Sequence, residues 1–370
     1  MLNEYIYRIA INFMPQLNRV AKLPFWEKIG GFTELSNVKD SEWEELCLEY
    51  GIRAQQADRD SAIKRAINEA SLMEKYGISL LSFDDYNYPQ LLLECPDAPL
   101  FLYYKGTLFH EQNALAIVGT RAASEGCKEI IREIVGEVSQ RENPPIIVSG
   151  LAYGIDICAQ RAAIECNLRT YAVVANGLGT IYPAANRDVA NQIISKGIGA
   201  ILSEYPCNSL TQKSYFLERN RIIAGISNWL LVGESGLKGG SMVTAKIAFS
   251  YGREIMAIPG SPLTHNAQGC NQLIKHNMAA LVENGNDVAE FLGLTSKKLT
   301  SQGKFQFYET LGKEESAILD ILKRNREGMN IDELSRITNI PIGTITGIVL
   351  KMEISSLIYA LPGGKYRICK

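Results

Sequence analysis

The sequence predicts an α/β fold in which a parallel sheet forms the core, a helical domain precedes it and a winged-helix domain follows it. From about residue 80 to residue 293, continuously apolar runs of strand length alternate with helical stretches. Such strands are typical of parallel sheets that are covered by helices on both faces. Before this region the apolar residues recur at helical spacing, and after residue 309 three amphipathic helical segments precede a hairpin-like segment.

The composition is that of an ordinary soluble protein with two or three domains. The chain has 370 residues, 46% of them hydrophobic and 21% charged, with a formal net charge of −2. Its first residues lack the pattern of a secretory signal, and no apolar run approaches the roughly 20 residues of a membrane span. The eight cysteines are scattered and form no CxxC pair, and the chain has only three histidines, so neither a disulfide framework nor a zinc cluster is expected. We therefore expect a cytoplasmic protein without metal or cofactor.

Residues 1–75 are expected to form a helical domain. Apolar residues recur at helical spacing at Ile6, Ile9 and Phe13, and residues 23–38 have the pattern of two short helices joined at Gly30–Gly31. This segment is compatible with a SAM-like or helix-hairpin-helix unit, which presents backbone amides to DNA phosphates. A small helical packing domain is the favoured interpretation, because the segment is slightly acidic.

Residues 76–294 are expected to form a Rossmann-like domain. Many of its predicted strands end in Gly, Ser, Asn or Glu, at the edge where open α/β sheets bind their ligands. These strands are expected at 114–119, 144–150, 170–177, 199–206, 228–235, 254–260 and 279–285.

A linker at 295–309 is expected to lead into a winged helix-turn-helix domain at 310–370. Three helical segments precede a hairpin with a Pro-Gly-Gly turn. The third segment offers Thr344, Thr346 and Lys351 but few cations. A DNA-binding and a protein-binding winged helix are therefore equally compatible with this sequence.

The turn after the first strand of the Rossmann-like domain departs from a dinucleotide-binding pattern. In the stretch AIVGTRAAS, Gly119 follows the strand, and Arg121 stands where a dinucleotide fold requires a second glycine. A guanidinium at this position matches a phosphodiester, and the missing glycine argues against a dinucleotide. The alternative is that Arg121 pairs with a carboxylate such as Asp156 and only holds the turn.

Similar turns follow several of the predicted strands, and together they predict a track of phosphate-binding sites. Backbone amides at helix starts, hydroxyl groups and a few cations are the groups that bind anionic oxygens. The candidates are Gly119, Thr120, Arg121 and Ser124; Ser149, Gly150 and Gly154; Asn186 and Arg187; Asn220 and Arg221; and Lys238, Gly240, Ser241 and Thr244.

Seven short motifs occur in order over about half of the chain: IVGTR, SGLAxGID, GLxxxYPxxN, SEYP, FxxRNRIIAG, GGSxxTA and GRExxAIPG. This series closely resembles the DNA-processing protein A family (DprA, also called Smf). The resemblance implies a non-enzymatic protein that binds single-stranded DNA through its Rossmann-like domain, forms a homodimer and loads RecA recombinase onto the bound strand. It further implies a role in natural transformation or homologous recombination, and contact between Arg121 and the DNA backbone.

The sequence departs from the family pattern at three positions. Tyr153 stands where the family usually has Arg, Gln160 where it usually has His, and Gly179 where an acidic residue is common. The loss of Arg at position 153 removes a cation. Tyrosine would instead stack on a base, as aromatic side chains do in single-strand grooves.

Other residues near these motifs are assigned mainly structural roles. Asp156 has the spacing of a helix cap, and Phe216 is expected in the core. Arg219 and Arg221 are two residues apart and cannot share one face of a helix. We expect Asn220 and Arg221 to meet DNA and Arg219 to pack.

Two other functions remain open. The segment LKGGSMVTA aligns loosely with the motif of Rossmann-like phosphoribohydrolases that act on nucleotides, but residues 243–245 offer no acid where their catalytic glutamate would stand. A scaffold protein with a vestigial phosphate track is the other alternative, and salt-sensitive binding of oligonucleotides would count against it.

Overall fold

The computed structural model describes residues 2–14, 39–49, 56–110, 113–295, 313–325, 328–354, 357–361 and 364–368. The chain divides into two compact units, Met1–Ser296 and Lys297–Lys370, each described by itself below. The helix pair expected at 23–38 and nearly all of the expected linker lie outside the described residues. Within these ranges, no helix combines the length and apolar character needed to cross a bilayer.

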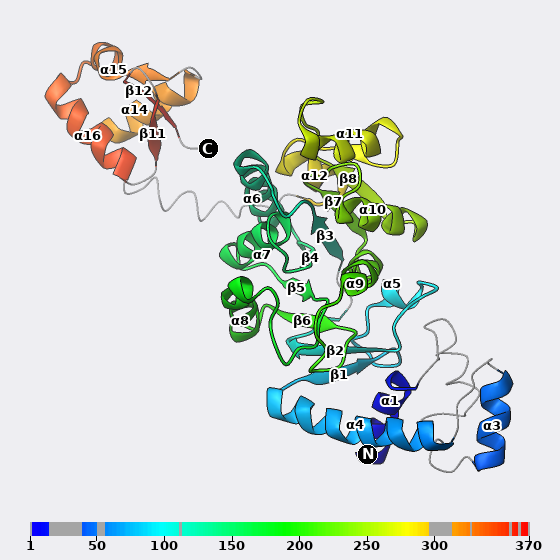
Figure 1. Cartoon of the computed structure of the whole chain (residues 1–370). Coiled ribbons are helices and arrows are strands. Elements are labelled where there is room, and N and C mark those ends of the chain that lie inside the picture. Colours follow the sequence, from blue (N-terminus) through cyan, green and yellow to red (C-terminus); the bar gives the residue numbers. More distant parts are fainter. Residues whose placement is uncertain are drawn as a thin grey trace. The chain divides into compact units, whose positions relative to one another are not determined.

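A nine-stranded sheet with the order β1-β2-β6-β5-β4-β3-β7-β8-β9 forms the centre of the first unit (Figure 1). In this order, each strand from β6 through β5, β4, β3, β7 and β8 to β9 pairs in parallel with its neighbour. This confirms the predicted α/β fold with a parallel sheet at its core. Each of these strands overlaps one of the seven predicted runs. Their bounds are β3 (Ala114–Val118), β4 (Ile146–Ser149), β5 (Thr170–Val173), β6 (Gly199–Ser203), β7 (Trp229–Val232), β8 (Glu254–Ala257) and β9 (Ala280–Leu281).

Two antiparallel strands, which the sequence analysis did not predict, extend the sheet at one edge. β1 (Ser79–Ser82) pairs with β2 (Phe101–Gly106), and β2 pairs with β6, both antiparallel. Antiparallel pairing needs no helical crossover, so these strands lack the strand–helix alternation from which the others were predicted. The sheet is therefore mixed rather than wholly parallel.

Helices cover both faces of the sheet because its central strands are apolar on both sides. In β3, Ala116 and Val118 pack into one hydrophobic cluster, while Leu115 and Ile117 pack into another. The first cluster is completed by α9 (Lys213–Ile226), α10 (Gly240–Ser250) and α11 (Gln268–Lys275). The second is completed by α6 (Glu125–Ser139), α7 (Ile155–Glu165) and α12 (Gly285–Phe291).

The N-terminal helices share a hydrophobic core with the sheet. Ile9 and Ala66 are buried in one cluster with Tyr103 of β2 and Ile201 of β6. The domain boundary at residue 75 remains a prediction. The helices of this region are α1 (Leu2–Asn12), α3 (Asp40–Glu49) and α4 (Gln56–Tyr76), and the unit also contains α5 (Gln90–Leu93), η2 (Ala184–Asn186), α8 (Arg187–Ser195) and η3 (His265–Ala267).

The second unit combines three helices with a three-stranded antiparallel sheet of order β10-β12-β11. Asn330 and Glu333 form a capping box that starts the second helix, and Leu334 and Ile345 lie in the unit's core. Its elements are α14 (Lys313–Arg324), β10 (Met329–Asn330), α15 (Ile331–Thr338), α16 (Ile342–Ile354), β11 (Ile358–Leu361) and β12 (Lys365–Ile368).

Candidate functional site

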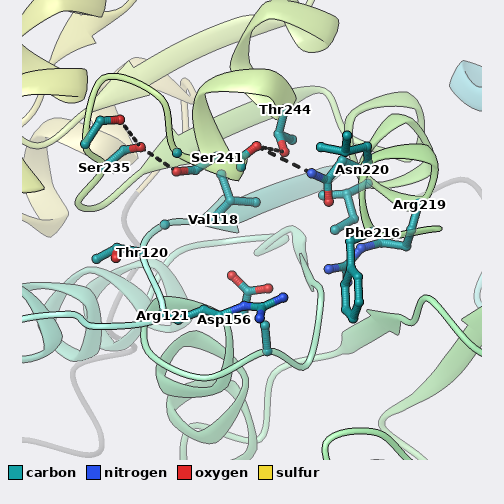
Figure 2. A pocket seen from close by; sticks show the side chains of 17 residues that line it. Val118, Thr120, Arg121, Asp156, Phe216, Arg219, Asn220, Ser235, Ser241 and Thr244 are labelled. Carbon is teal, nitrogen blue, oxygen red and sulfur yellow. Dashed lines mark hydrogen bonds between the residues drawn. The ribbon is translucent and has the colours of Figure 1, made fainter. Parts of the chain in front are cut away.

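The strand order reverses at β3, and a pocket of about 370 Å³ lies at this point of the sheet. Open α/β sheets bind ligands in the crevice outside the carboxyl ends of their strands where the order reverses. The pocket is lined by the turns that follow β3, β4 and β7 and by residues of α9 and α10 (Figure 2). We call it the switch-point pocket.

Arg121 lies at the switch-point pocket with its guanidinium over the ring of Phe216. The guanidinium carbon is 5.0 Å from the ring centroid, and both residues line the pocket (Figure 2). Arg121 is exposed and makes no ion pair within the described part of the chain. Phe216 is half-buried and also contacts the ring of Tyr182. The expectation that Phe216 lies in the core is therefore wrong, because its ring forms part of the pocket wall.

Asp156 and Arg219 form the charged base of the pocket, and both are buried. Asp156 accepts a hydrogen bond of 3.1 Å from the Gly150 amide. Burial is the main influence on both groups: it raises the pKa of Asp156 and lowers the pKa of Arg219, while each partner's charge opposes that shift. Arg219 rather than Arg121 is the cation that acts most strongly on Asp156.

The helix-cap role expected for Asp156 is wrong. Gly154 occupies the N-cap position of α7, with a φ of 78°, and Asp156 lies in the first turn of that helix. The carboxylate reaches back to the β4–α7 turn instead. Gly154 is required in this turn, because a Cβ there would collide with the carbonyl oxygens of Thr120 and Arg121.

The turn after β7 places an acid, Glu234, at the start of α6. Ser124 caps this helix by accepting a hydrogen bond from the Cys127 amide. Its hydroxyl also donates to the Glu234 carboxylate at 2.5 Å, and its amide donates to the same carboxylate at 2.9 Å. Glu234 thus occupies the position where an anion would bind at this helix start.

The start of α10 brings hydroxyl groups and backbone to the opposite wall. Ser241 donates to the hydroxyl of Ser235 at 2.7 Å, and Thr244 donates to the carbonyl of Gly240 at 3.2 Å (Figure 2). Asn220 donates to that same carbonyl at 3.4 Å. Lys238, in the preceding turn, is exposed.

The remaining residues of the predicted track contribute unevenly to the protein surface. Ser149 is fully buried and donates to the Ile117 carbonyl, and Asn186 is buried and donates to the Leu151 carbonyl. Arg187 and Tyr153 are exposed, with 49% of Tyr153 accessible.

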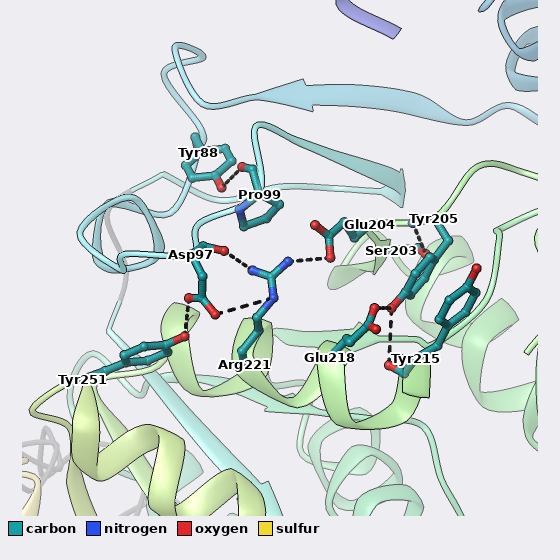
Figure 3. A network of polar contacts seen from close by, with 10 residues as sticks. All are labelled: Tyr88, Asp97, Pro99, Ser203, Glu204, Tyr205, Tyr215, Glu218, Arg221 and Tyr251. Carbon is teal, nitrogen blue, oxygen red and sulfur yellow. Dashed lines mark hydrogen bonds and ion pairs between the residues drawn. The ribbon is translucent and has the colours of Figure 1, made fainter. Parts of the chain in front are cut away.

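The structure gives Arg221 a different role from the predicted contact with DNA. Arg221 is 4% exposed and pairs with Glu204 at 2.5 Å. It also donates to the carbonyl oxygen of Asp97, whose carboxylate accepts a hydrogen bond from Tyr251 (Figure 3). Arg221 therefore ties α9 to the segment before β2 and to the end of β6, while its neighbour Arg219 lines the pocket.

The switch-point pocket gathers seven of the predicted residues: Gly119, Thr120, Arg121, Asn220, Gly240, Ser241 and Thr244. The other nine do not line it: Ser124, Ser149, Gly150, Tyr153, Gly154, Asn186, Arg187, Arg221 and Lys238. The sequence analysis missed Ser235 and assigned Phe216 and Arg219 to packing. The FLERNR segment could have indicated that Phe216 and Arg219 lie together, because their spacing of three places them on one side of a helix.

The chemistry of the lining suits anion and aromatic binding. Among the described residues, Asp156 is the one carboxylate that lines the pocket, and it is buried beside Arg219. No group of three or more His, Cys, Asp and Glu side chains in the described ranges is arranged to hold a metal ion. A cation on an aromatic ring, beside exposed backbone at a helix start, offers contacts for a phosphate and for a planar base.

Comparison with known proteins gives a consistent set of relatives. The family described as DNA recombination-mediator protein A matches residues 79–293. A protein named Smf from Synechocystis sp. is 33% identical over 320 residues, which cover 78% of this chain and 79% of that protein. A DNA processing protein DprA from Streptococcus pneumoniae is 40% identical over 229 residues, which cover 61% of this chain and 79% of that protein.

Two solved structures of similar sequence have a similar fold. The X-ray structure of DprA from Streptococcus pneumoniae has a TM-score of 0.63 and 31% identity, covering 78% of this chain and 98% of that one. A structure of DprA from Helicobacter pylori has a TM-score of 0.51 and 29% identity, covering 58% of this chain and 95% of that one. The family match, the relatives along most of the chain and these structures agree, and this chain belongs to the DNA-processing protein A (DprA/Smf) family.

Proposed function

We propose that this protein binds single-stranded DNA at the switch-point pocket, with Arg121 on a phosphate and Phe216 against a base. The observation that carries the proposal is the exposed guanidinium of Arg121 over the Phe216 ring, at the edge of the sheet where such folds bind ligands. Cations that contact the backbone, combined with aromatic rings that stack on bases, are the means by which proteins hold single strands without reading their sequence.

Two further observations support this proposal. The buried Nε of Arg219, a pocket-lining residue, has no hydrogen-bond partner within the described residues, so a bound phosphate oxygen would satisfy it. The Helicobacter pylori structure is described as giving insight into the single-stranded DNA binding mode of that protein. We propose the same class of ligand for the pocket of this chain.

Membership of the family supports a wider role. We propose that the protein acts by binding rather than by catalysis, that it works in the cytoplasm as a homodimer, and that it protects single-stranded DNA and loads RecA onto it in transformation or recombination. Within the predicted track, we propose that the backbone of Gly119, Thr120 and Gly240 and the charged side chain of Lys238 contact the DNA strand. The buried residues Ser149 and Asn186 then hold the turns.

We also propose that the second unit is a winged helix that docks on protein. Its order of helix, strand, two helices and hairpin is that of a winged helix. Lys351 of α16 is bound to Glu315 at 2.7 Å, while Ile342 and Leu350 of the same helix are more than half exposed. A helix that presents apolar side chains and a paired lysine suits a protein surface better than a DNA groove.

Fluorescence titration of an oligo-dT and a matched duplex at two salt concentrations tests the main proposal. We expect the protein to prefer the single strand, to bind it less tightly at higher salt, and to lose affinity in Arg121→Ala and Phe216→Ala. Loss of the Phe216 ring would cost about 1–3 kcal/mol per stacked base.

Arg169→Ala is the matched control. Arg169 is also exposed and lies 4.2 Å from the centroid of Phe109, but it precedes β5 and so lies at the amino ends of the parallel strands. Its replacement removes the same charge and the same kind of ring contact. Equal losses in Arg121→Ala and Arg169→Ala, or no single-strand binding by the unaltered protein, would refute the proposal.

A further inference from the structure

A second hollow lies between α6 and α7, next to the switch-point pocket. Its volume is about 350 Å³, and three cations line it: Lys128 and Arg132 from α6, and Arg161 from α7. Glu125 and Glu165 line it as well, so cations outnumber acids by one. We call it the α6–α7 groove.

The β4–α7 turn separates the groove from the pocket. Ala152 of this turn and Asp156 of the first turn of α7 line the switch-point pocket, whereas Gly154 and Ile157 line the α6–α7 groove. Tyr153 lies between these residues in the chain and is 49% exposed. Its ring contacts no other aromatic ring in the described part of the protein. An unpartnered tyrosine therefore stands on the ridge between two hollows.

The cations of the groove are available to a ligand. Arg132 is exposed and forms no ion pair within the described residues. Arg161 approaches Asp188 at 3.6 Å, and both side chains are more than half exposed. Lys128 pairs with Glu125 at 2.6 Å, but 76% of the Glu125 side chain is exposed. Exposed pairs of this kind contribute at most about 1 kcal/mol, so a phosphate would displace them at little cost.

Cys158 of α7 lies close to the cations of α6: its thiol donates a hydrogen bond of 3.4 Å to the carbonyl oxygen of Lys128. The thiol of Cys158 lines the groove and is almost fully buried. Burial raises its pKa, and the positive charges of Arg132 and Lys128 are the strongest opposing influences. Two cations of α6 thus act on the thiol of Cys158, which belongs to α7.

We propose that a single strand leaving the switch-point pocket crosses the Tyr153 ridge, and that its next phosphates lie in the α6–α7 groove against Arg132 and Arg161. This inference rests on the proposed function, since it extends the same ligand beyond the pocket. Tyr153 stacks on the base at the crossing. At position 153 this chain thus offers a stacking ring in place of the family's usual cation. The cations that would contact the DNA backbone lie instead on α6 and α7.

The test compares a short oligo-dT of about four nucleotides with a long one of about twenty, each titrated at several salt concentrations. The double variant Arg132→Ala/Arg161→Ala should bind the short strand as the unaltered protein does and the long strand several-fold more weakly. For a single strand, each phosphate that the protein no longer neutralises makes the slope of log affinity against log salt shallower by about 0.7. We therefore expect the slope for the long strand to become shallower by about 1.4 in the double variant.

Two variants separate the contribution of the ridge from that of general charge. Tyr153→Ala should weaken binding of the long strand, and Tyr153→Phe should restore it, because phenylalanine keeps the stacking face. The control Arg169→Ala removes a cation outside the groove and should change neither affinity nor salt slope. Thermal unfolding of each variant checks that the fold is kept.

The outcomes distinguish this inference from the proposed function. If the double variant binds the long strand with unchanged affinity and slope, or binds both strands equally weakly, the path through the groove is wrong while pocket binding stands. If the unaltered protein binds neither strand, the proposed function fails first and the path fails with it.

Discussion

Three arginines of this protein show that burial and partners decide what a side chain does. Arg121 is exposed and rests on an aromatic ring, Arg219 is buried beside Asp156 in the pocket wall, and Arg221 is buried and paired with Glu204. An exposed guanidinium can exchange water for phosphate, whereas a buried and paired one would have to give up its carboxylate first. Of these three, Arg121 is therefore the most accessible for the proposed contact with a phosphate.

The network around Arg221 predicts a loss of stability rather than of DNA affinity. Arg221→Met keeps the volume of the stem but leaves the Glu204 carboxylate, which is 11% exposed, without this cation. Breaking a buried pair in this way costs about 3–5 kcal/mol. The free energy of unfolding in urea should fall by that order, while the folded variant keeps its affinity for oligo-dT.

Arg187→Met is the matched control for this substitution. Arg187 is exposed at the start of α8 and has no ion pair among the described residues, so its replacement should change stability by no more than about 0.5 kcal/mol. If Arg221→Met instead remains stable and loses DNA affinity, its side chain meets DNA, as the sequence analysis expected.

At the scale of elements, the turns after the strands position the site, and Gly154 is a tightly constrained residue in one of them. Its φ of 78° and ψ of −122° suit glycine, and its lack of a side chain lets the β4–α7 turn approach the β3–α6 turn. The Ile155 amide completes this approach by donating to the Thr120 carbonyl at 3.3 Å. The position of Arg121 thus depends on a residue that does not line the switch-point pocket.

Gly154→Ala should lower both stability and DNA affinity. The backbone conformation alone costs a residue with a side chain about 1–3 kcal/mol, and the added Cβ would push Thr120 and Arg121 away. Urea unfolding and oligo-dT titration measure the two effects. Gly136→Ala is the control: a Cβ meets nothing within 4 Å in this α6 position, so helix propensity should raise stability by about 0.5–1 kcal/mol. Unchanged affinity in Gly154→Ala would show that Arg121 does not depend on this turn.

The docking of α1 should depend on pH through one ion pair. Arg8 of α1 binds both carboxylate oxygens of Asp84, at 2.8 and 3.1 Å. Burial raises the pKa of Asp84, but hydrogen bonds and the Arg8 charge outweigh it and leave the pKa below its usual value. Because the folded-state pKa is the lower one, this stabilisation is present above the unfolded pKa of about 3.9 and is lost as the pH falls through the folded value.

Arg8→Met tests this dependence. The pair is partly exposed, so the variant should be less stable than the unaltered protein by at most about 1 kcal/mol at neutral pH. Urea unfolding from neutral to strongly acidic pH should show this difference shrinking to zero below the folded pKa of Asp84. A difference that stays constant across this range would assign the effect to the packing of the Arg8 stem.

For the whole molecule, the parallel part of the fold was predictable and its extension at the edge was not. Runs such as Ala114–Val118 are buried on both faces, so burial itself makes them continuously apolar in the sequence. The antiparallel strands β1 and β2 are not joined by a helical crossover of the kind that links parallel strands, so the alternation of apolar runs and helical stretches did not predict them. The seven parallel strands could therefore be placed, but the mixed character of the sheet could not.

The candidate site was predictable to the level of its turns but not of every side chain. Gly119 and Arg121 were found because the strand and the turn chemistry coincide. The sequence could not decide between Arg219 and Arg221. Their spacing shows that the two side chains face apart on the helix, but it does not show which of them meets the carboxylates of Glu204 and Asp97. Those carboxylates come from distant segments, which only the folded chain brings together.

The separate cores of the two units predict two unfolding transitions. In the described ranges, the three hydrophobic clusters of the first unit contain no residue of the second, and the cluster around Leu334 and Ile345 contains none of the first. Cooperative unfolding follows a shared core, and multi-domain proteins commonly depart from a single transition. Calorimetry of the full chain should therefore resolve a larger and a smaller transition.

A matched pair of core substitutions assigns these transitions. Leu102 and Leu334 are both fully buried, one in each unit, and replacing either with alanine costs about 2–5 kcal/mol. Leu334→Ala should lower the temperature of the smaller transition alone, and Leu102→Ala that of the larger one alone. Oligo-dT affinity should survive Leu334→Ala, because the switch-point pocket lies in the first unit. If calorimetry instead shows one transition, and each substitution lowers its temperature, the units unfold together. The second unit would then contribute to the stability of the DNA site.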